Sequence, residues 1–240
     1  MEKIGNWFFK WRGHLPFIIF ALIIFSLRYF KYVDSSEKMD DFWEVICFLI
    51  SFLGFGIRVY TVGHAPDGTS GRNTDKQVAD TLNTTGIYSV VRNPLYLGNF
   101  IIWLGILLFV NLWGLTLLSV VIFFIYYKFI ILAEEAFLRR KFEEKYNAWV
   151  KNTPSFIPKI TGWKKPSQPF SLRKVLRKEF NGFFAIILGF TLIEIVGDVV
   201  VTGKLELATG WRVIFGTGCL VFLVILFLKK KTDILFHKKI

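Results

Sequence analysis

Residues 86–98, GIYSVVRNPLYLG, lie where a polar loop meets a long apolar run, and the rest of the chain is organised around them. Asn93 followed by Pro94 predicts a helix start, because asparagine is a preferred N-cap and proline suits the first helical position. Backbone N–H groups at a helix start favour an anion, and Arg92 adds a positive charge just before the cap. The stretch therefore predicts a donor-rich pocket at the mouth of a membrane helix.

Six apolar runs in the chain come near the roughly 20 residues that a helix needs to cross a bilayer. They cover residues 15–30, 42–60, 95–112, 115–133, 182–201 and 211–228. Only Trp113 and Gly114 separate the third run from the fourth, so we expect a tight helical hairpin with Asn111, Trp113 and Gly114 at its turn. A chain that is 53% hydrophobic and 18% aromatic belongs to the membrane class. The predicted fold is an all-α polytopic membrane protein with about six transmembrane helices.

After the fourth run, apolar side chains recur at helical spacing between basic ones. The apolar positions are Leu138, Phe142, Tyr146, Trp149 and Val150. This pattern predicts a cytoplasmic amphipathic helix over residues 135–150, lying at the membrane interface. Pro154 and Pro158 are expected to end helical structure.

We therefore expect four segments along the chain. Residues 1–62 hold the first two transmembrane helices, and residues 63–158 form a core of polar loop, helical hairpin and interfacial helix. Residues 159–181 are a basic linker, and residues 182–240 hold the last two transmembrane helices with a basic tail. The polar loop is either a lid or a solvated connector whose Arg72 and Lys76 contact headgroups.

The net charge of +12 comes from basic residues that cluster beside the apolar runs. Such clusters favour anionic lipid headgroups as partners and argue against nucleic acid. Lys and Arg are in excess before the first run, over residues 139–178 and at the C-terminus, and cytoplasmic loops carry that excess. With six spans, both termini and residues 86–98 are expected on the cytoplasmic side, where a water-soluble cofactor can reach them.

Cysteine and histidine are few and scattered. Cys47 and Cys219 lie in different apolar runs, which predicts two buried thiols and no disulfide. His14, His64 and His237 do not have the spacing of metal ligands, so we expect no metal.

Two blocks of residues and a tail occur in one order and spacing. The first block contains Gly86, Tyr88, Arg92, Pro94, Tyr96 and Gly98, the second contains Glu134, Glu135 and Leu138, and the tail contains Phe142, Tyr146 and residues 154–158. Over residues 85–158 the chain thereby resembles the isoprenylcysteine carboxyl methyltransferase and phospholipid methyltransferase family of integral-membrane enzymes. The family usually has histidine where this chain has Asn93. That difference puts any imidazole chemistry in doubt, whereas hydrogen bonding or capping by Asn93 is not affected.

Members of that family use S-adenosylmethionine as methyl donor, so the resemblance implies this cofactor here. The sulfonium of the cofactor suits the aromatic rings of Tyr88 and Tyr96. Arg92 is expected to bind the cofactor carboxylate or an anionic acceptor. Glu134 or Glu135 is expected to accept a hydrogen bond from the cofactor amine or ribose, because carboxylates near membrane depth need partners.

The candidate catalytic residues are Arg92, Asn93 and Tyr96. The candidate cofactor contacts are Tyr88, Arg92, Tyr96, Gly98, Glu134 and Glu135. Alternatives remain open for several of them. The arginine and the tyrosines are also typical of headgroup contacts and interface anchors, and Gly98 serves either close approach of the cofactor or helix packing. Glu135 has a possible structural partner in Arg139 one helical turn later.

No general base stands out among these residues. A phosphate or carboxylate acceptor is already anionic near neutral pH, so methyl transfer to it needs mainly alignment in a dry site. With the family resemblance, this favours O-methylation of an anionic lipid or lipid-anchored group, such as lipid A phosphate or a carboxylate, at a bacterial inner membrane. The alternatives are N-methylation of a phospholipid amine and a non-enzymatic transporter or assembly factor.

Overall fold

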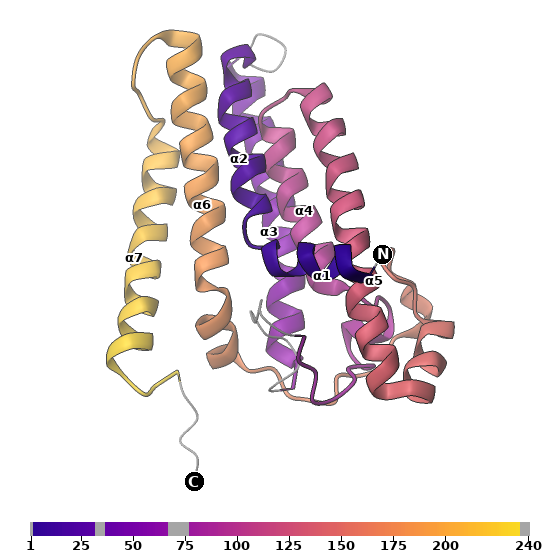
Figure 1. Cartoon of the computed structure of the whole chain (residues 1–240). Coiled ribbons are helices and arrows are strands. Elements are labelled where there is room, and N and C mark those ends of the chain that lie inside the picture. The colour runs from indigo at the N-terminus through magenta and orange to yellow at the C-terminus, as the bar shows by residue number, and fades with distance from the viewer. Residues whose placement is uncertain (1, 32–36, 67–76, 236–240) are drawn as a thin grey trace.

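Every apolar run is helical in the computed structural model of the chain, which describes residues 2–31, 37–66 and 77–235. The helices are α1 (Glu2–Trp11), α2 (Leu15–Ser26), α3 (Glu37–His64), α4 (Pro94–Phe109), α5 (Trp113–Asn152), α6 (Leu172–Thr202) and α7 (Thr209–Lys231). Short 3-10 turns lie at η1 (Leu27–Tyr29), η3 (Ile87–Ser89) and η4 (Ile160–Gly162). Figure 1 shows α2 to α7 running along one common axis, whereas α1 lies across them. The prediction of an all-α fold is confirmed for the described residues.

Four helices are long and apolar enough, by length and composition, to cross a membrane. They are α3 from Met39 onwards, α5, α6 and α7. Phe17–Tyr29 and Pro94–Phe109 are apolar helices of shorter length. The structure therefore confirms helices at all six expected runs, and within the described residues four of them reach the length of a candidate span.

The fourth apolar run and the amphipathic helix form one element, so the boundary expected between them is wrong. Residues 133–142 contain no glycine or proline, and α5 continues through them. Glu143 interrupts the helix with φ 43° and ψ −112°. Beyond this kink Tyr146 is fully buried while Lys145 is exposed, as the amphipathic pattern predicts.

The segment expected to be a basic linker is partly helical, because α6 begins at Leu172 instead of residue 182. Ser171 is the N-cap, and its hydroxyl oxygen accepts a hydrogen bond from the backbone N–H of Lys174 at 3.3 Å. Val175 and Phe180 are buried in the turns that follow. The cap and these buried side chains extend α6 well beyond its apolar run.

The helical hairpin between α4 and α5 is confirmed, but its turn lies earlier than expected. Asn111 has φ 53°, a left-handed conformation that asparagine tolerates better than most residues. Trp113 and Gly114 are the first residues of α5. The Thr116 hydroxyl donates to the carbonyl oxygen of Leu107 at 3.2 Å, which ties the two helices together across the turn.

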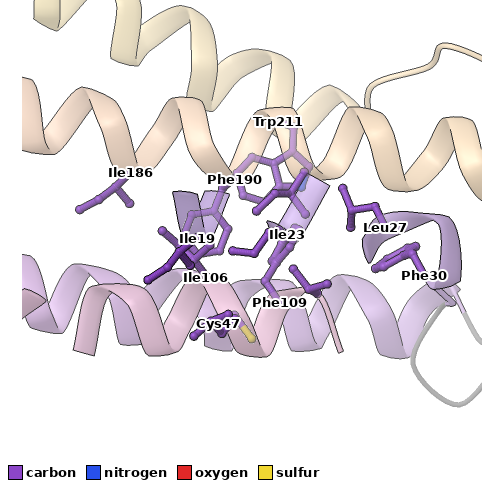
Figure 2. Packing of buried hydrophobic residues seen from close by; sticks show 13 residues of the cluster. Ile19, Ile23, Leu27, Phe30, Cys47, Ile106, Phe109, Ile186, Phe190 and Trp211 are labelled. Atoms are coloured by element: carbon purple, nitrogen blue, oxygen red, sulfur yellow. The ribbon is translucent and has the colours of Figure 1, made fainter. Parts of the chain in front are cut away.

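The central core draws on α2, α3, α4, α6 and α7. Figure 2 shows Ile23, Cys47 and Phe190 among the buried side chains that meet between these helices. The Trp211 ring of α7 stacks on Phe190 with centroids 6.0 Å apart, and its indole N–H donates to Glu44 Oε2 at 2.9 Å. The last two helices therefore share one core with the N-terminal helices.

Buried polar groups of the core find partners across helices. Glu194 of α6 forms a hydrogen bond with Glu44 of α3. Both cysteines are free, and Cys47 is buried as predicted whereas Cys219 is only half-buried. The core is thus held by apolar packing with a few paired polar groups.

Glycines bring α3 and α4 into backbone contact. A Cβ atom added to Gly54 would lie 2.6 Å from the carbonyl oxygen of Gly98. A Cβ atom on Gly105 would lie 2.5 Å from the carbonyl oxygen of Cys47. Close approach of this kind is typical of packed membrane helices. It holds the start of α4, and with it residues 86–98, against the C-terminal half of α3.

Candidate active site

We call residues 153–165, which follow α5, the clasping segment, because they form hydrogen bonds along the backbone of residues 86–93. Gly86 N–H donates to Lys164 O, Arg92 N–H donates to Pro154 O, and Lys159 N–H donates to Val90 O, each at 2.9 Å. Gly86 has φ 59°, a conformation that glycine adopts without strain. These bonds fix the backbone that leads into α4.

Asn93 lies at the N-cap position of α4, with Pro94 at the first helical position as predicted. Its side chain makes no cap hydrogen bond. The Asn93 amide instead donates to the carbonyl oxygen and the hydroxyl of Ser155, at 3.0 and 3.1 Å. The prediction of a hydrogen-bond donor is confirmed and that of a side-chain cap is wrong, because the amide points to the clasping segment.

Arg92 and Glu135 bind each other. The Arg92 Nε and Nη2 atoms each lie 2.9 Å from Glu135 Oε1, and Nη1 donates to the carbonyl oxygen of Thr153 at 2.6 Å. Arg92, and not Arg139, is therefore the charged partner of Glu135. The pair joins the start of α4 to α5 and to the clasping segment.

Glu134 is held less tightly than Glu135. Its Oε1 atom accepts a hydrogen bond from the Tyr96 hydroxyl at 2.8 Å and lies 3.3 Å from Arg12 Nη1. Arg12 comes from the end of α1, which packs against α5 so closely that a Cβ atom on Gly5 would overlap Phe129 O. Sequence reasoning missed α1 and Arg12, although an amphipathic pattern in residues 2–11 would have indicated the helix.

A second arginine that sequence reasoning missed lies deeper in the bundle. Arg58 of α3 donates from Nε and Nη2 to the two oxygens of Glu179, each at 2.9 Å, and from Nη1 to Asn99 Oδ1 at 2.7 Å. A Cβ atom on Gly98 would lie 2.7 Å from Arg58 Cγ. Of the two roles left open for Gly98, the geometry matches helix packing. The signal for Arg58 was a lone charge within an apolar run.

Tyr88 is affected by the charges of both Glu134 and Arg58. Burial raises the pKa of its phenol above the ordinary value, the charge of Glu134 raises it further, and a hydrogen bond with Asn83 and the charge of Arg58 oppose the shift. The charges of both Glu134 and Arg58 therefore act on the Tyr88 phenol. A small pocket opens beside it, lined among others by Thr61, His64, Asn83, Thr85, Pro166 and Ser167. Arg72 and Lys76 lie outside the described residues.

The structure thus brings the predicted site residues to one end of the bundle. Three Arg–Glu pairs form there: Arg12 with Glu134, Arg58 with Glu179, and Arg92 with Glu135. The opposite charges balance, the Tyr96 hydroxyl donates to Glu134, and the charges of Glu134 and Arg58 act on Tyr88. Such a site suits a ligand that carries both a cation and an anion. The described residues contain no group of His, Cys, Asp or Glu able to hold a metal ion, and His237 lies outside them.

Part of the chain is similar in sequence to known proteins. The sequence model of the family described as phospholipid methyltransferase matches residues 46–145. The chain is 26% identical over 147 residues to the nickel-cobalt-cadmium resistance protein NccN of Alcaligenes xylosoxydans xylosoxydans, covering 60% of this chain and 66% of NccN. It is 27% identical over 153 residues to the cobalt-zinc-cadmium resistance protein CzcN of Cupriavidus metallidurans, covering 63% of each.

The matched region spans less than two thirds of either relative's length. No solved structure matches the chain. The family match contains Arg58 and the motif residues from Tyr88 to Glu135, so the resemblance seen in the sequence is confirmed there. Residues 46–145 of this chain are thus similar to the phospholipid methyltransferase family.

Proposed function

We propose that the chain is an S-adenosylmethionine-dependent methyltransferase that acts at the cytoplasmic membrane face on a lipid or lipid-anchored acceptor. The observation that carries this proposal is the convergence of Tyr88, Arg92, Tyr96, Glu134 and Glu135 at one end of the bundle. All five belong to the segment that matches the methyltransferase family.

The charges of the site fit the cofactor. Both contacts of Glu134 fall on Oε1, so Oε2 is the carboxylate oxygen that we assign to the cofactor amine or ribose. The rings of Tyr88 and Tyr96 are assigned to the sulfonium. When bound, the cofactor supplies a methyl group on a positively charged sulfur. Arg92 and Glu135, bound to each other, hold the backbone that presents the two tyrosines.

We assign an anionic acceptor, with the phosphate of a lipid such as lipid A as the first choice and a carboxylate as the second. In such a transfer an acceptor oxygen forms a bond to the methyl carbon while the carbon–sulfur bond breaks, and sulfur keeps the electron pair. The acceptor would lose one negative charge, and no proton would have to be removed. Exposed Lys159, Lys164 and Lys165 lie on the clasping segment and suit anionic headgroups. An amine acceptor would need a base in addition.

The membrane arrangement belongs to the same proposal. We infer six spans, including the two shorter apolar helices, with both termini and the site on the cytoplasmic side of a bacterial inner membrane. Flanking charges that snorkel allow a shorter helix to cross. The excess of Lys and Arg at this end of the bundle supports the orientation.

A second candidate is a non-enzymatic transporter or assembly factor, and the names of the relatives would place it in a metal-resistance system. Binding of S-adenosylmethionine separates the two functions, because a transporter or assembly factor has no use for that cofactor.

The deciding experiment is calorimetry of the purified protein in detergent with S-adenosylmethionine. We expect binding by the wild-type protein and a loss of well over tenfold for Glu134→Ala, because removing one partner of a buried charged contact costs about 2–5 kcal/mol. Glu144→Ala is the matched control, since Glu144 is an exposed acid on the same helix. Mass spectrometry of lipids from cells with and without the gene should show a shift of one methylene. A wild-type protein that does not bind the cofactor would refute the proposal.

A further inference from the structure

The Arg58–Glu179 pair links the site to a helix outside the segment that matches the family. Glu179 lies on α6, and its side chain is only 3% exposed. It receives two hydrogen bonds from the Arg58 guanidinium, one on each oxygen. Charged groups at such depth in a membrane bundle are costly unless they are paired or used. The resemblance seen in the sequence covers residues 85–158 and ends before α6 begins at Leu172.

A chain of contacts runs from Glu179 to the candidate cofactor residues. Arg58 donates to Asn99, and the Asn99 amide donates to the Tyr127 hydroxyl at 3.4 Å. The Tyr127 ring contacts the Tyr96 ring with centroids 4.8 Å apart. Tyr96 in turn donates to Glu134. These contacts connect a carboxylate of α6 to Tyr96, one of the two tyrosines assigned to the sulfonium.

The sign of the charge matters as much as the position. Arg58 lies close enough to Tyr88 for its charge to act on the phenol. S-adenosylmethionine carries a net positive charge through its sulfonium, so an unpaired arginine beside the site would repel it. The other arginines at the site, Arg12 and Arg92, are neutralised by Glu134 and Glu135. Glu179 does the same for Arg58.

We propose that Glu179 is a positioning residue of the methyltransferase site: it aims Arg58 at Asn99 and neutralises it, so that the site accepts a cationic cofactor. The inference rests on the proposed function. It makes α6 a part of the site and not an accessory. If Glu179 had a merely structural role, its loss would weaken the binding of every ligand of the site alike. If it compensates the charge of Arg58, its loss would weaken the binding of the sulfonium ligand more.

Two ligands separate these roles, because S-adenosylhomocysteine lacks the methyl group and the positive charge of the cofactor but otherwise has the same groups. The experiment measures the dissociation constants of both ligands by calorimetry for the wild type and Glu179→Gln. Glu179→Gln removes a unit charge about 10 Å from the sulfonium, in an effective dielectric of about 20 to 40. The dissociation constant of S-adenosylmethionine, divided by that of S-adenosylhomocysteine, should therefore rise by about four- to fifteenfold. Glu179→Asp, which keeps the charge, should leave the ratio near that of the wild type.

Glu206→Gln is the control, since Glu206 is an exposed acid between α6 and α7 and should change neither constant. The double variant Arg58→Gln with Glu179→Gln removes both charges, so its ratio should return to the wild-type value even if both ligands bind more weakly. The double variant also serves if Glu179→Gln does not fold, and a ratio far from the wild-type value would then overturn the inference.

The outcomes distinguish the inference from the proposed function. A wild-type protein that binds neither ligand refutes the proposed function. A wild type that binds both, with an unchanged ratio in Glu179→Gln, leaves the function standing and overturns the role of Glu179.

Discussion

Replacing Glu135 with glutamine should destabilise the protein by leaving the Arg92 guanidinium without its counter-charge. The two side chains are only 13% and 16% exposed, so water replaces the lost carboxylate only in part. Removing one partner of a buried ion pair costs about 3–5 kcal/mol. The Thr153 carbonyl still holds Nη1, and the glutamine oxygen still accepts one hydrogen bond. We therefore expect a loss somewhat below that range, about 2–3 kcal/mol in the free energy of unfolding.

The assay is unfolding of the purified protein in mild detergent, by heat or by titration with a denaturing detergent. Glu144→Gln is the matched control and should change the free energy of unfolding by about 0.5 kcal/mol or less, because its side chain is exposed. The double variant Arg92→Met with Glu135→Leu removes both charges and should recover part of the stability. If Glu135→Gln changed the free energy of unfolding as little as the Glu144 control, the Arg92–Glu135 ion pair would not stabilise the protein as we describe.

Three further predictions test the local structure and the topology. Asn93→Ala should lose about 1 kcal/mol of unfolding free energy, because it loses the hydrogen bonds to the clasping segment. Asn93→His should retain much of the methyl-transfer rate. A large new activity of Asn93→His that titrates near pH about 6.5 would show that an imidazole acts chemically there. Gly54→Leu should separate α3 from α4 and cost about 1–3 kcal/mol or more, while Gly56→Leu, with nothing within 4 Å of an added Cβ atom, should be tolerated in the same unfolding assay. Reporter fusions at Gly114 and at Thr209 should both report the outer side, and a cytoplasmic signal at either would contradict the six-span arrangement.

The sequence motif predicted which residues form the candidate site but not which of them bind each other. The residue types and their order indicated that Arg92, Tyr96, Glu134 and Glu135 belong to one polar site, and the structure brings them together. The sequence did not indicate the ion-pair partners of these residues. Glu135 had an obvious candidate one helical turn away in sequence, yet it binds an arginine that precedes α4, because the kinked end of α5 and the clasping segment fold back over the motif.

The sequence alone determined where the membrane helices lie and at which end the motif stands. Backbone polar groups in a bilayer must be satisfied within a helix, so a long apolar run leaves little choice of structure. Only the tertiary structure decided which charges neutralise each other. Arg12 and Glu134 are 122 residues apart, and Arg58 and Glu179 are 121 residues apart. Each pair depends on how α1, α3 and α6 pack against the rest of the bundle, and that packing depends on the shapes of many side chains at once, which no local pattern of the chain expresses.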